Sequence, residues 1–134
     1  MQATPIVSII GRSRTGKTTL LEKVIPELKR RGYRVATVKH HAHAGFEIDY
    51  AGKDSWRHAR AGSDVVIIAA PDKIASIRRL PREQTLDEIA AAVSGVDIIL
   101  TDGYRSAGKP AIAVVRATDS EELASLPAQV FAVA

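Results

Sequence analysis

Nine consecutive residues near the N-terminus have the types and spacing of a phosphate-binding loop. From Gly11 to Thr19 the chain reads GRSRTGKTT, which fits the Walker A pattern G-x-x-x-x-G-K-[ST]. Glycines let the backbone curl, so that successive N–H groups can bind phosphate oxygens at a helix N-terminus, where the helix dipole is positive. Lys17 would reach the β- and γ-phosphates, and Thr18 would bind Mg²⁺ through its hydroxyl. The predicted nucleotide-binding residues of this loop are Gly11, Arg12, Ser13, Arg14, Thr15, Gly16, Lys17, Thr18 and Thr19.

The elements on either side of the loop fit this chemistry. Residues 6–10 form a short β-branched run, typical of a buried strand. After the loop, apolar residues recur at helical spacing from Lys17 to Arg31, and Gly32 is a typical residue for the end of a helix. Pro26 lies inside the helical pattern, so we expect a kink or a break about one turn before it.

The remaining patterns alternate between strand and helix. We expect strands at 33–39, 64–70, 96–101, 111–116 and 129–133, and helices at 49–61, 85–94 and 119–126. Thr85 and Glu88 have the spacing of a capping box, and residues 73–79 could be a further short strand. This order predicts an α/β protein with the three-layer phosphate-loop NTPase fold, in which a mostly parallel sheet carries helices on both faces. No linker divides the chain, so we expect one nucleotide-binding domain over 1–134.

A magnesium site in such a sheet requires a carboxylate at the carboxyl end of a strand beside the loop. Two aspartates flank the strand expected at 96–101. Asp97 precedes the strand core and therefore lies at the wrong end. Asp102 follows the strand directly, so Asp102 and Thr18 are the predicted metal ligands. The alternative is that Asp102 serves only the turn it begins with Gly103, because Asp-Gly is a common turn pair.

Composition narrows the classes of function. The 134 residues include no cysteine, which excludes disulfides, thiolate metal sites and cysteine nucleophiles. Aromatic residues make up only 4% of the chain, fewer than single-stranded nucleic acid binding usually requires, and we expect no nucleic-acid site. No apolar stretch approaches the ~18 residues of a membrane span, and the first ten residues do not resemble a secretory signal, so we expect a cytoplasmic protein. Residues 1–67 carry twelve Lys and Arg against six Asp and Glu, which suits an anionic ligand.

Four stretches together resemble the molybdopterin-guanine dinucleotide biosynthesis protein B (MobB) family. The Walker A loop alone is generic, whereas the VKHHAH stretch at 38–43 and the DYAGKDSWRH run at 49–58 are much more particular. The fourth stretch is DGYR at 102–105. The resemblance covers most of residues 5–116.

This resemblance implies a homodimeric phosphate-loop protein that binds GTP with Mg²⁺, hydrolyses it slowly, and assists the guanylyltransferase that joins GMP to molybdopterin. Gly11, Gly16, Lys17 and Thr18 would bind the nucleotide. Asp102 stands where the family usually has glutamate, which is one methylene longer, so a water-bridged metal contact is allowed beside a direct one. The chain contains no N-K-x-D or T-K-x-D motif, and a preference for guanine therefore rests on the resemblance alone.

A basic and histidine-rich segment follows the second strand and is expected to line the nucleotide pocket. If 49–61 is one helix, Lys53, Arg57 and Arg60 share a face and could hold a γ-phosphate or the phosphate of molybdopterin. The plain alternative is a solvated helix with intrahelical ion pairs. The residues predicted to bind ligand here are Lys39, His40, Asp49, Lys53 and Arg57. His40 and His43 could instead ligate a metal, but two imidazoles make an incomplete site and ordinary loop residues are the favoured interpretation.

Three functions remain open, and the favoured one is the GTP-binding adaptor. Its turnover should be slow, because no residue of a predicted switch loop would position the attacking water, so the chain is at most a slow GTP hydrolase. Lys17 and Arg14 are the candidate catalytic residues, since Arg14 or Arg12 could stabilise transferred charge across a dimer. The alternatives are a small-molecule kinase and a nickel-insertion GTPase, and the absence of cysteine weakens the second.

Overall fold

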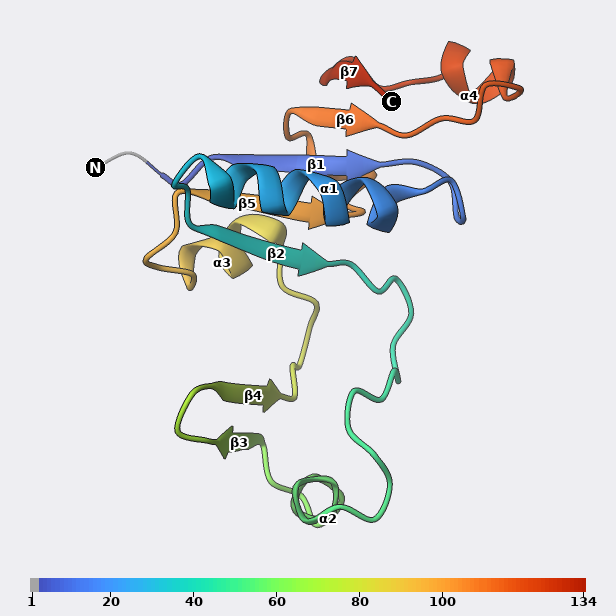
Figure 1. Cartoon of the computed structure of the whole chain (residues 1–134). Coiled ribbons are helices and arrows are strands. Elements are labelled where there is room, and N and C mark those ends of the chain that lie inside the picture. Colours follow the sequence, from blue (N-terminus) through green and yellow to red (C-terminus); the bar gives the residue numbers. More distant parts are fainter. Residues whose placement is uncertain (1–2) are drawn as a thin grey trace. The chain divides into compact units, whose positions relative to one another are not determined.

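The computed structural model describes residues 3–134, which form two compact units (Figure 1). The first unit contains the described residues before His41 together with Thr85–Ala134, and the second is His41–Gln84. The chain thus leaves the first unit after the second strand of its sheet and returns to it at the cap of a helix. The expectation of a single nucleotide-binding domain over 1–134 stays a prediction.

The first unit is built on a five-stranded parallel sheet with the order β2-β5-β1-β6-β7. Strand β1 (Ile6–Ile10) is central, between β5 (Ile98–Asp102) and β6 (Ala111–Ala113). Strands β2 (Val35–Lys39) and β7 (Val130–Val133) form the two edges. Burial of β1 on both faces explains why four of its five residues are apolar, since a central strand of a parallel sheet is covered on both sides.

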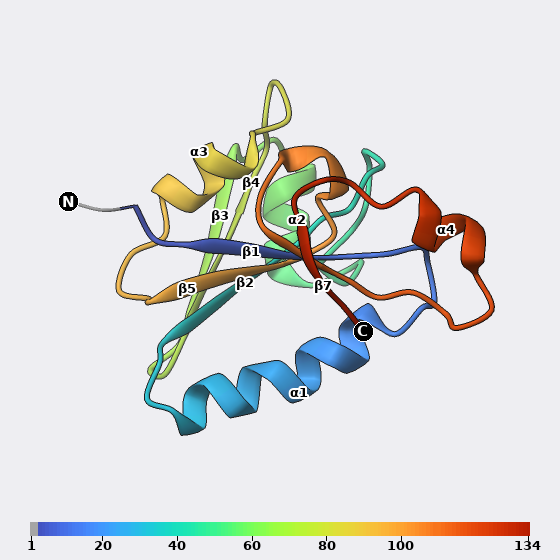
Figure 2. The same cartoon turned by 90° about the horizontal axis from the view of Figure 1, so that it is seen from above.

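Helices cover both faces of this sheet (Figure 2). On one face Ile9 and Leu100 pack against Leu21 of α1 (Lys17–Arg30). On the other face Ile6 and Ile99 pack against Leu86 of α3 (Leu86–Ala91). Neighbouring strand residues point to opposite faces, so adjacent residues such as Ile99 and Leu100 serve different cores. The predicted fold class, with its mostly parallel sheet and helices on both faces, is confirmed.

Shorter elements complete the first unit. A 3₁₀ helix, η1 (Arg105–Ala107), follows β5, and α4 (Ser120–Ala124) lies between β6 and β7. The capping box predicted at the start of α3 is present, because the Thr85 hydroxyl accepts from the Glu88 N–H and the Glu88 carboxylate accepts from the Thr85 N–H. Among the helices that the structure describes, none has the length and hydrophobicity needed to cross a membrane.

Of the kink or break expected about one turn before Pro26, the break is wrong. Helix α1 continues through Pro26 to Arg30. Proline removes one backbone donor, but apolar side chains before and after it, Val24 and Leu28, pack on the same core. Most helix stability in a protein comes from such tertiary packing of the apolar face, which here outweighs the local preference.

The second unit corrects two further expectations. The helix expected at 49–61 is confined to α2 (Asp54–Arg60), because Gly52 has a left-handed backbone with φ of 90°. The strand expected at 64–70 is β3 (Val65–Ala69), but it lies in an antiparallel hairpin with β4 (Ile74–Arg78) and outside the parallel sheet. Only four residues join the two strands, and a parallel pair would require a crossover of roughly a dozen or more.

Candidate functional site

The phosphate loop lies between β1 and α1 and takes the tight curvature that its sequence predicts. Gly16 caps α1 with φ of 105°, a conformation that residues with a Cβ rarely adopt, and Arg14 has φ of 61°. The first helical hydrogen bond runs from the Leu20 N–H to the Gly16 oxygen at 2.9 Å. The Thr15 hydroxyl donates to the Arg12 oxygen at 2.8 Å and so stabilises the turn from within.

Gly11 is required for a different reason, which is close packing. A Cβ added there would lie 2.5 Å from the backbone oxygen of Val114 and 2.9 Å from the Thr15 hydroxyl. Val114 is held in place because its N–H donates to the Ile10 oxygen at 2.8 Å. The loop can therefore pass this point only without a side chain.

Replacing Gly11 by alanine is expected to lower the free energy of unfolding by about 1–3 kcal/mol, the usual cost of overpacking. The expected cause is the clash with the Val114 oxygen, which belongs to backbone and cannot rotate away. Denaturant unfolding of the variant and the wild type measures the difference. Equal free energies of unfolding would show that the loop does not approach Val114 this closely.

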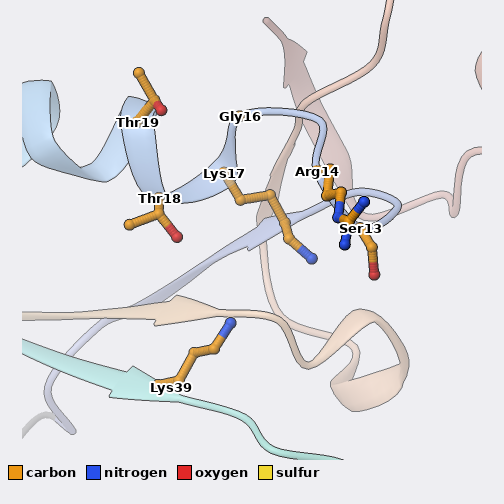
Figure 3. A pocket seen from close by; sticks show the side chains of 7 residues that line it. All are labelled: Ser13, Arg14, Gly16, Lys17, Thr18, Thr19 and Lys39. Carbon is orange, nitrogen blue, oxygen red and sulfur yellow. The ribbon is translucent and has the colours of Figure 1, made fainter.

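A pocket of about 420 Å³ opens at the loop and contains more positive than negative charge (Figure 3). Lys17 extends from the start of α1 and Lys39 from the end of β2, both towards this pocket. The Lys17 ammonium donates to the Gly11 oxygen at 2.9 Å. The lining residues are Ser13, Arg14, Gly16, Lys17, Thr18, Thr19 and Lys39.

Asp102 lies where the sequence predicts a metal-binding carboxylate. It is the last residue of β5, in register with Ile9 on one side and Lys39 on the other. The Thr18 hydroxyl donates to its Oδ2 atom at 3.0 Å. Thr18 and Asp102, far apart in the sequence, are thus brought into contact.

The two oxygens of Asp102 have different surroundings. The residue is only 7% exposed, yet within the described part of the chain its Oδ1 atom accepts no hydrogen bond. Among the described residues, the nearest cation to Oδ1 is the Lys39 ammonium at 3.5 Å. A buried carboxylate oxygen beside a threonine hydroxyl fits Mg²⁺, which prefers oxygen ligands. Thr18 and Asp102 are the residues that would hold the ion.

Arg12 has partners that sequence reasoning missed. Its guanidinium contacts Asp119 at 3.0 Å and Glu122 at 3.1 Å. The Glu122 side chain is 5% exposed and also contacts Arg105 at 2.7 Å. These ion pairs connect the phosphate loop to α4. In a separate contact, the Arg116 guanidinium donates to the Arg14 backbone oxygen at 2.8 Å. A direct role of Arg12 at the nucleotide stays a prediction.

The segment that follows β2 is divided between the two units. Lys39 and His40 belong to the first unit, where the His40 ring stacks on Tyr104 with the ring centroids 4.3 Å apart. Asp49, Lys53 and Arg57 belong to the second unit. Their part in ligand binding stays a prediction.

Local contacts occupy these residues within the second unit. A hydrogen bond from the Ser55 hydroxyl, followed by one from the Tyr50 N–H, lowers the pKa of the Asp49 carboxyl below its usual value. The Lys53 ammonium lies 4.7 Å from the centre of the Tyr50 ring. Lys53 precedes α2 as its N-cap, so the basic ridge expected from one long helix is reduced to Arg57 and Arg60.

The histidines form no built metal site in the region that the structure covers. No group of three or more His, Asp or Glu side chains between residues 3 and 134 has the arrangement of a metal-ligand set. The His43 ring instead meets His41 edge to face, with centroids 6.2 Å apart.

Comparison with known proteins places this chain in a family. The sequence model of the family "Molybdopterin guanine dinucleotide synthesis protein B" (MobB) matches residues 6–134. The chain is 39% identical, over 132 residues, to the molybdopterin-guanine dinucleotide biosynthesis adapter protein of Haemophilus influenzae, with 97% of this chain and 74% of that protein aligned.

Solved structures agree with the sequence comparison. The crystal structure of a molybdopterin-guanine biosynthesis protein B superposes with a TM-score of 0.74 at 38% identity, covering 96% of this chain and 80% of that one. The structure of Bacillus subtilis MobB gives a TM-score of 0.77 at 27% identity, covering 96% and 78%. The family model covers nearly the whole chain, and the resemblance noted in the sequence is confirmed: this chain belongs to the MobB family of molybdopterin-guanine dinucleotide synthesis proteins.

Proposed function

We propose that this protein is a cytoplasmic GTP-binding adaptor of molybdopterin-guanine dinucleotide synthesis, which binds GTP with Mg²⁺ and assists the guanylyltransferase that acts on molybdopterin. The family membership supports the adaptor role. The observation that carries nucleotide binding is the 3.0 Å contact of Asp102 with Thr18, a residue that lines the cationic pocket together with Lys17. Direct binding of molybdopterin is part of the same proposal, with Arg57 and Lys53 as its candidate contacts.

In this proposal the loop binds the phosphates through a lysine side chain and through its backbone amides. Lys17 exchanges the Gly11 oxygen for the β- and γ-phosphates, and the backbone amides of the loop bind the remaining phosphate oxygens. Thr18 and Asp102 hold the metal. Bound Mg²⁺ supplies neutralising charge to the β- and γ-phosphate oxygens.

Slow hydrolysis follows from the side chains of the pocket. The lining contains hydroxyls, lysines and an arginine, and none of them is a base that could orient and activate water at neutral pH. Gln129 is engaged elsewhere, because its amide donates to the Arg105 oxygen at 3.1 Å. The pocket therefore favours binding over turnover.

Replacing Arg14 by alanine is expected to lower the rate of GTP hydrolysis at least tenfold and GTP affinity only about twofold to threefold. The side chain lines the pocket, where its charge would act mainly on the transferring γ-phosphate. Single-turnover hydrolysis and calorimetric titration measure the two effects separately. Equal losses in rate and affinity would contradict a catalytic role for Arg14.

Calorimetry with GTP, ATP and GDP, each with and without Mg²⁺, tests the proposed function. We expect GTP to bind more tightly than ATP, to require Mg²⁺ for full affinity, and to turn over at about one per minute or slower, at the low end of enzyme rates. Rapid phosphate transfer from ATP to a small acceptor would instead identify a small-molecule kinase. Stoichiometric nickel uptake would identify a metal-insertion GTPase.

We also propose that the protein is a homodimer whose interface includes the β3–β4 hairpin. Val65, Ile67 and Ile74 share one face of the hairpin, as the pairing of Ala69 with Ile74 requires. Ile67 is 60% exposed and Ile74 is 71% exposed. Large apolar side chains grouped on one exposed face are typical of a protein–protein interface. A two-stranded hairpin by itself is only marginally stable, so contact with a second subunit would stabilise it.

The double variant Ile67→Asp, Ile74→Asp is expected to be monomeric and to keep the GTP affinity of the wild type. The charges disrupt an apolar interface, and the substitutions lie outside the unit that contains the phosphate loop. Sedimentation at micromolar concentration measures the mass, and Leu123→Asp on α4, where Leu123 is 53% exposed, provides a control that should stay dimeric. A monomeric wild type, or a dimeric double variant, would overturn this interface.

A further inference from the structure

One carboxylate oxygen beside the phosphate loop has, among the described residues, an exposed lysine as its nearest charged neighbour. Asp102 is 7% exposed, and its Oδ2 atom is bound by the Thr18 hydroxyl at 3.0 Å. The Oδ1 atom is buried and, among the described residues, receives no hydrogen bond. Lys39 approaches this atom to 3.5 Å, which is longer than an ordinary N–H···O hydrogen bond. The Lys39 side chain is itself 68% exposed.

Burial makes the negative charge of Asp102 dependent on a nearby cation, because an unpaired buried carboxylate is strongly disfavoured. A lysine ammonium is a compact point charge on a flexible chain, so it can neutralise a carboxylate and also leave it. Solvent exposure weakens the attraction between Lys39 and Asp102 further. The pair therefore has the properties of a counter-ion contact that another cation can replace.

Lys39 also lines the phosphate pocket, and it does so from the opposite side to Lys17. Lys39 ends β2, whereas Lys17 begins α1. The position of Lys39 is well fixed at its backbone, because β2 pairs with β5 up to the register of Lys39 with Asp102. The next N–H, of His40, donates to the backbone carbonyl oxygen of Asp102 at 3.0 Å. Only the side chain of Lys39 is left to move between the carboxylate and the pocket.

We propose that Lys39 is a displaceable counter-ion of the metal site: its ammonium group neutralises Asp102 when no Mg²⁺ is bound, and turns to the γ-phosphate when Mg²⁺ takes its place. This inference rests on the proposed binding of GTP with Mg²⁺. It gives Lys39 two opposite effects. The ammonium competes with the metal for the Oδ1 atom, and after its release it adds a contact that a triphosphate has and a diphosphate lacks.

Two affinities therefore change in opposite directions when the charge is removed. Lys39→Met keeps the length of the side chain and removes the ammonium. It is expected to raise the affinity of the nucleotide-free protein for Mn²⁺, used as a spectroscopic substitute for Mg²⁺, by about tenfold, the effect of removing one competing positive charge. It is also expected to lower the preference for GTP over GDP, measured with Mg²⁺, by about tenfold.

Three control variants separate this role from a general change in charge. Arg14→Met removes one positive charge from the pocket that Lys39 also lines. It should change Mn²⁺ affinity by no more than about threefold. Lys23→Met removes an exposed charge elsewhere on α1 and should change neither affinity. Lys39→Arg keeps the charge and should retain most of the preference for GTP.

Electron paramagnetic resonance of Mn²⁺ with the nucleotide-free protein gives the first affinity, and calorimetry gives the second. The inference is supported if Lys39→Met alone tightens Mn²⁺ binding and also loses the preference for GTP. It is overturned if Mn²⁺ affinity is unchanged or undetectable in Lys39→Met, if Arg14→Met raises it equally, or if the GTP preference survives. The proposed function fails separately, when the wild type binds no GTP at all, because the Mn²⁺ titration uses no nucleotide.

Discussion

Replacing Lys17 by alanine is expected to weaken GTP binding by at least about 100-fold and to leave the protein folded. The Lys17 ammonium lies in the phosphate pocket and donates to the Gly11 oxygen at 2.9 Å, a contact it can exchange for the β- and γ-phosphates. Loss of that one hydrogen bond should cost stability only about 1 kcal/mol, because a water molecule can replace the ammonium.

Calorimetry gives the affinity of this variant, and circular dichroism with thermal unfolding shows whether it is folded. Lys23→Ala is the matched control, because Lys23 is an exposed lysine of the same helix and lines no part of the pocket. A Lys17→Ala protein that still binds GTP at micromolar concentration would remove the assignment of this loop.

Replacing Asp102 by asparagine is expected to abolish the effect of Mg²⁺ on GTP binding. With Mg²⁺ present, affinity should fall by about 10-fold to 100-fold, because the amide lacks the charge that a divalent cation requires. Without Mg²⁺, affinity should stay the same or rise, since a negative charge is removed from beside the phosphates. Asparagine keeps the size of the side chain and an oxygen that can accept from Thr18, so packing is preserved.

Asp97 at the opposite end of the same strand region provides the control for Asp102. Its carboxylate accepts from the Arg34 N–H at 2.7 Å, and this hydrogen bond, with the Arg34 side chain, lowers the pKa of Asp97. A lowered pKa stabilises the fold above the unfolded pKa of about 3.9, and this contribution is lost as pH falls through the folded pKa. Asp97→Asn should therefore reduce stability at neutral pH without changing the dependence of GTP binding on Mg²⁺. An Asp102→Asn protein that keeps its Mg²⁺ dependence would exclude Asp102 as a metal residue.

The parts of the molecule that follow short-range rules could be predicted from the sequence. The loop at 11–19, its flanking strand and helix, and the cap at Thr85 all depend on residues close together in the chain. Asp102 could be placed because parallel strands present their carboxyl ends at one edge, and β5 does lie beside β1. Register between β2 and β5 places Asp102 beside Lys39, and Thr18 in the first turn of α1 contacts its carboxylate.

Other parts could not be predicted, because they depend on contacts distant in sequence or on local signals that the apolar and helical patterns outweighed. No residue near Arg12 in the sequence indicates that it forms ion pairs with Asp119 and Glu122, which lie more than a hundred residues away. The apolar run at 64–70 has the composition of a central strand, and only the short connection through Pro71 and Asp72 indicated a hairpin. The helix expected from Asp49 is shorter because local hydrogen bonds to the Asp49 carboxylate compete with helical backbone.

The central claim is that the turn between β1 and α1 binds the phosphates of GTP, and a crystal structure with Mg²⁺ and a non-hydrolysable GTP analogue tests it most directly. The account predicts β- and γ-phosphate oxygens within hydrogen-bond distance of the backbone amides of this turn, with the Lys17 ammonium moved from the Gly11 oxygen onto the phosphates. A nucleotide bound elsewhere on the protein, with Lys17 still on Gly11 and no phosphate at the turn, would contradict it.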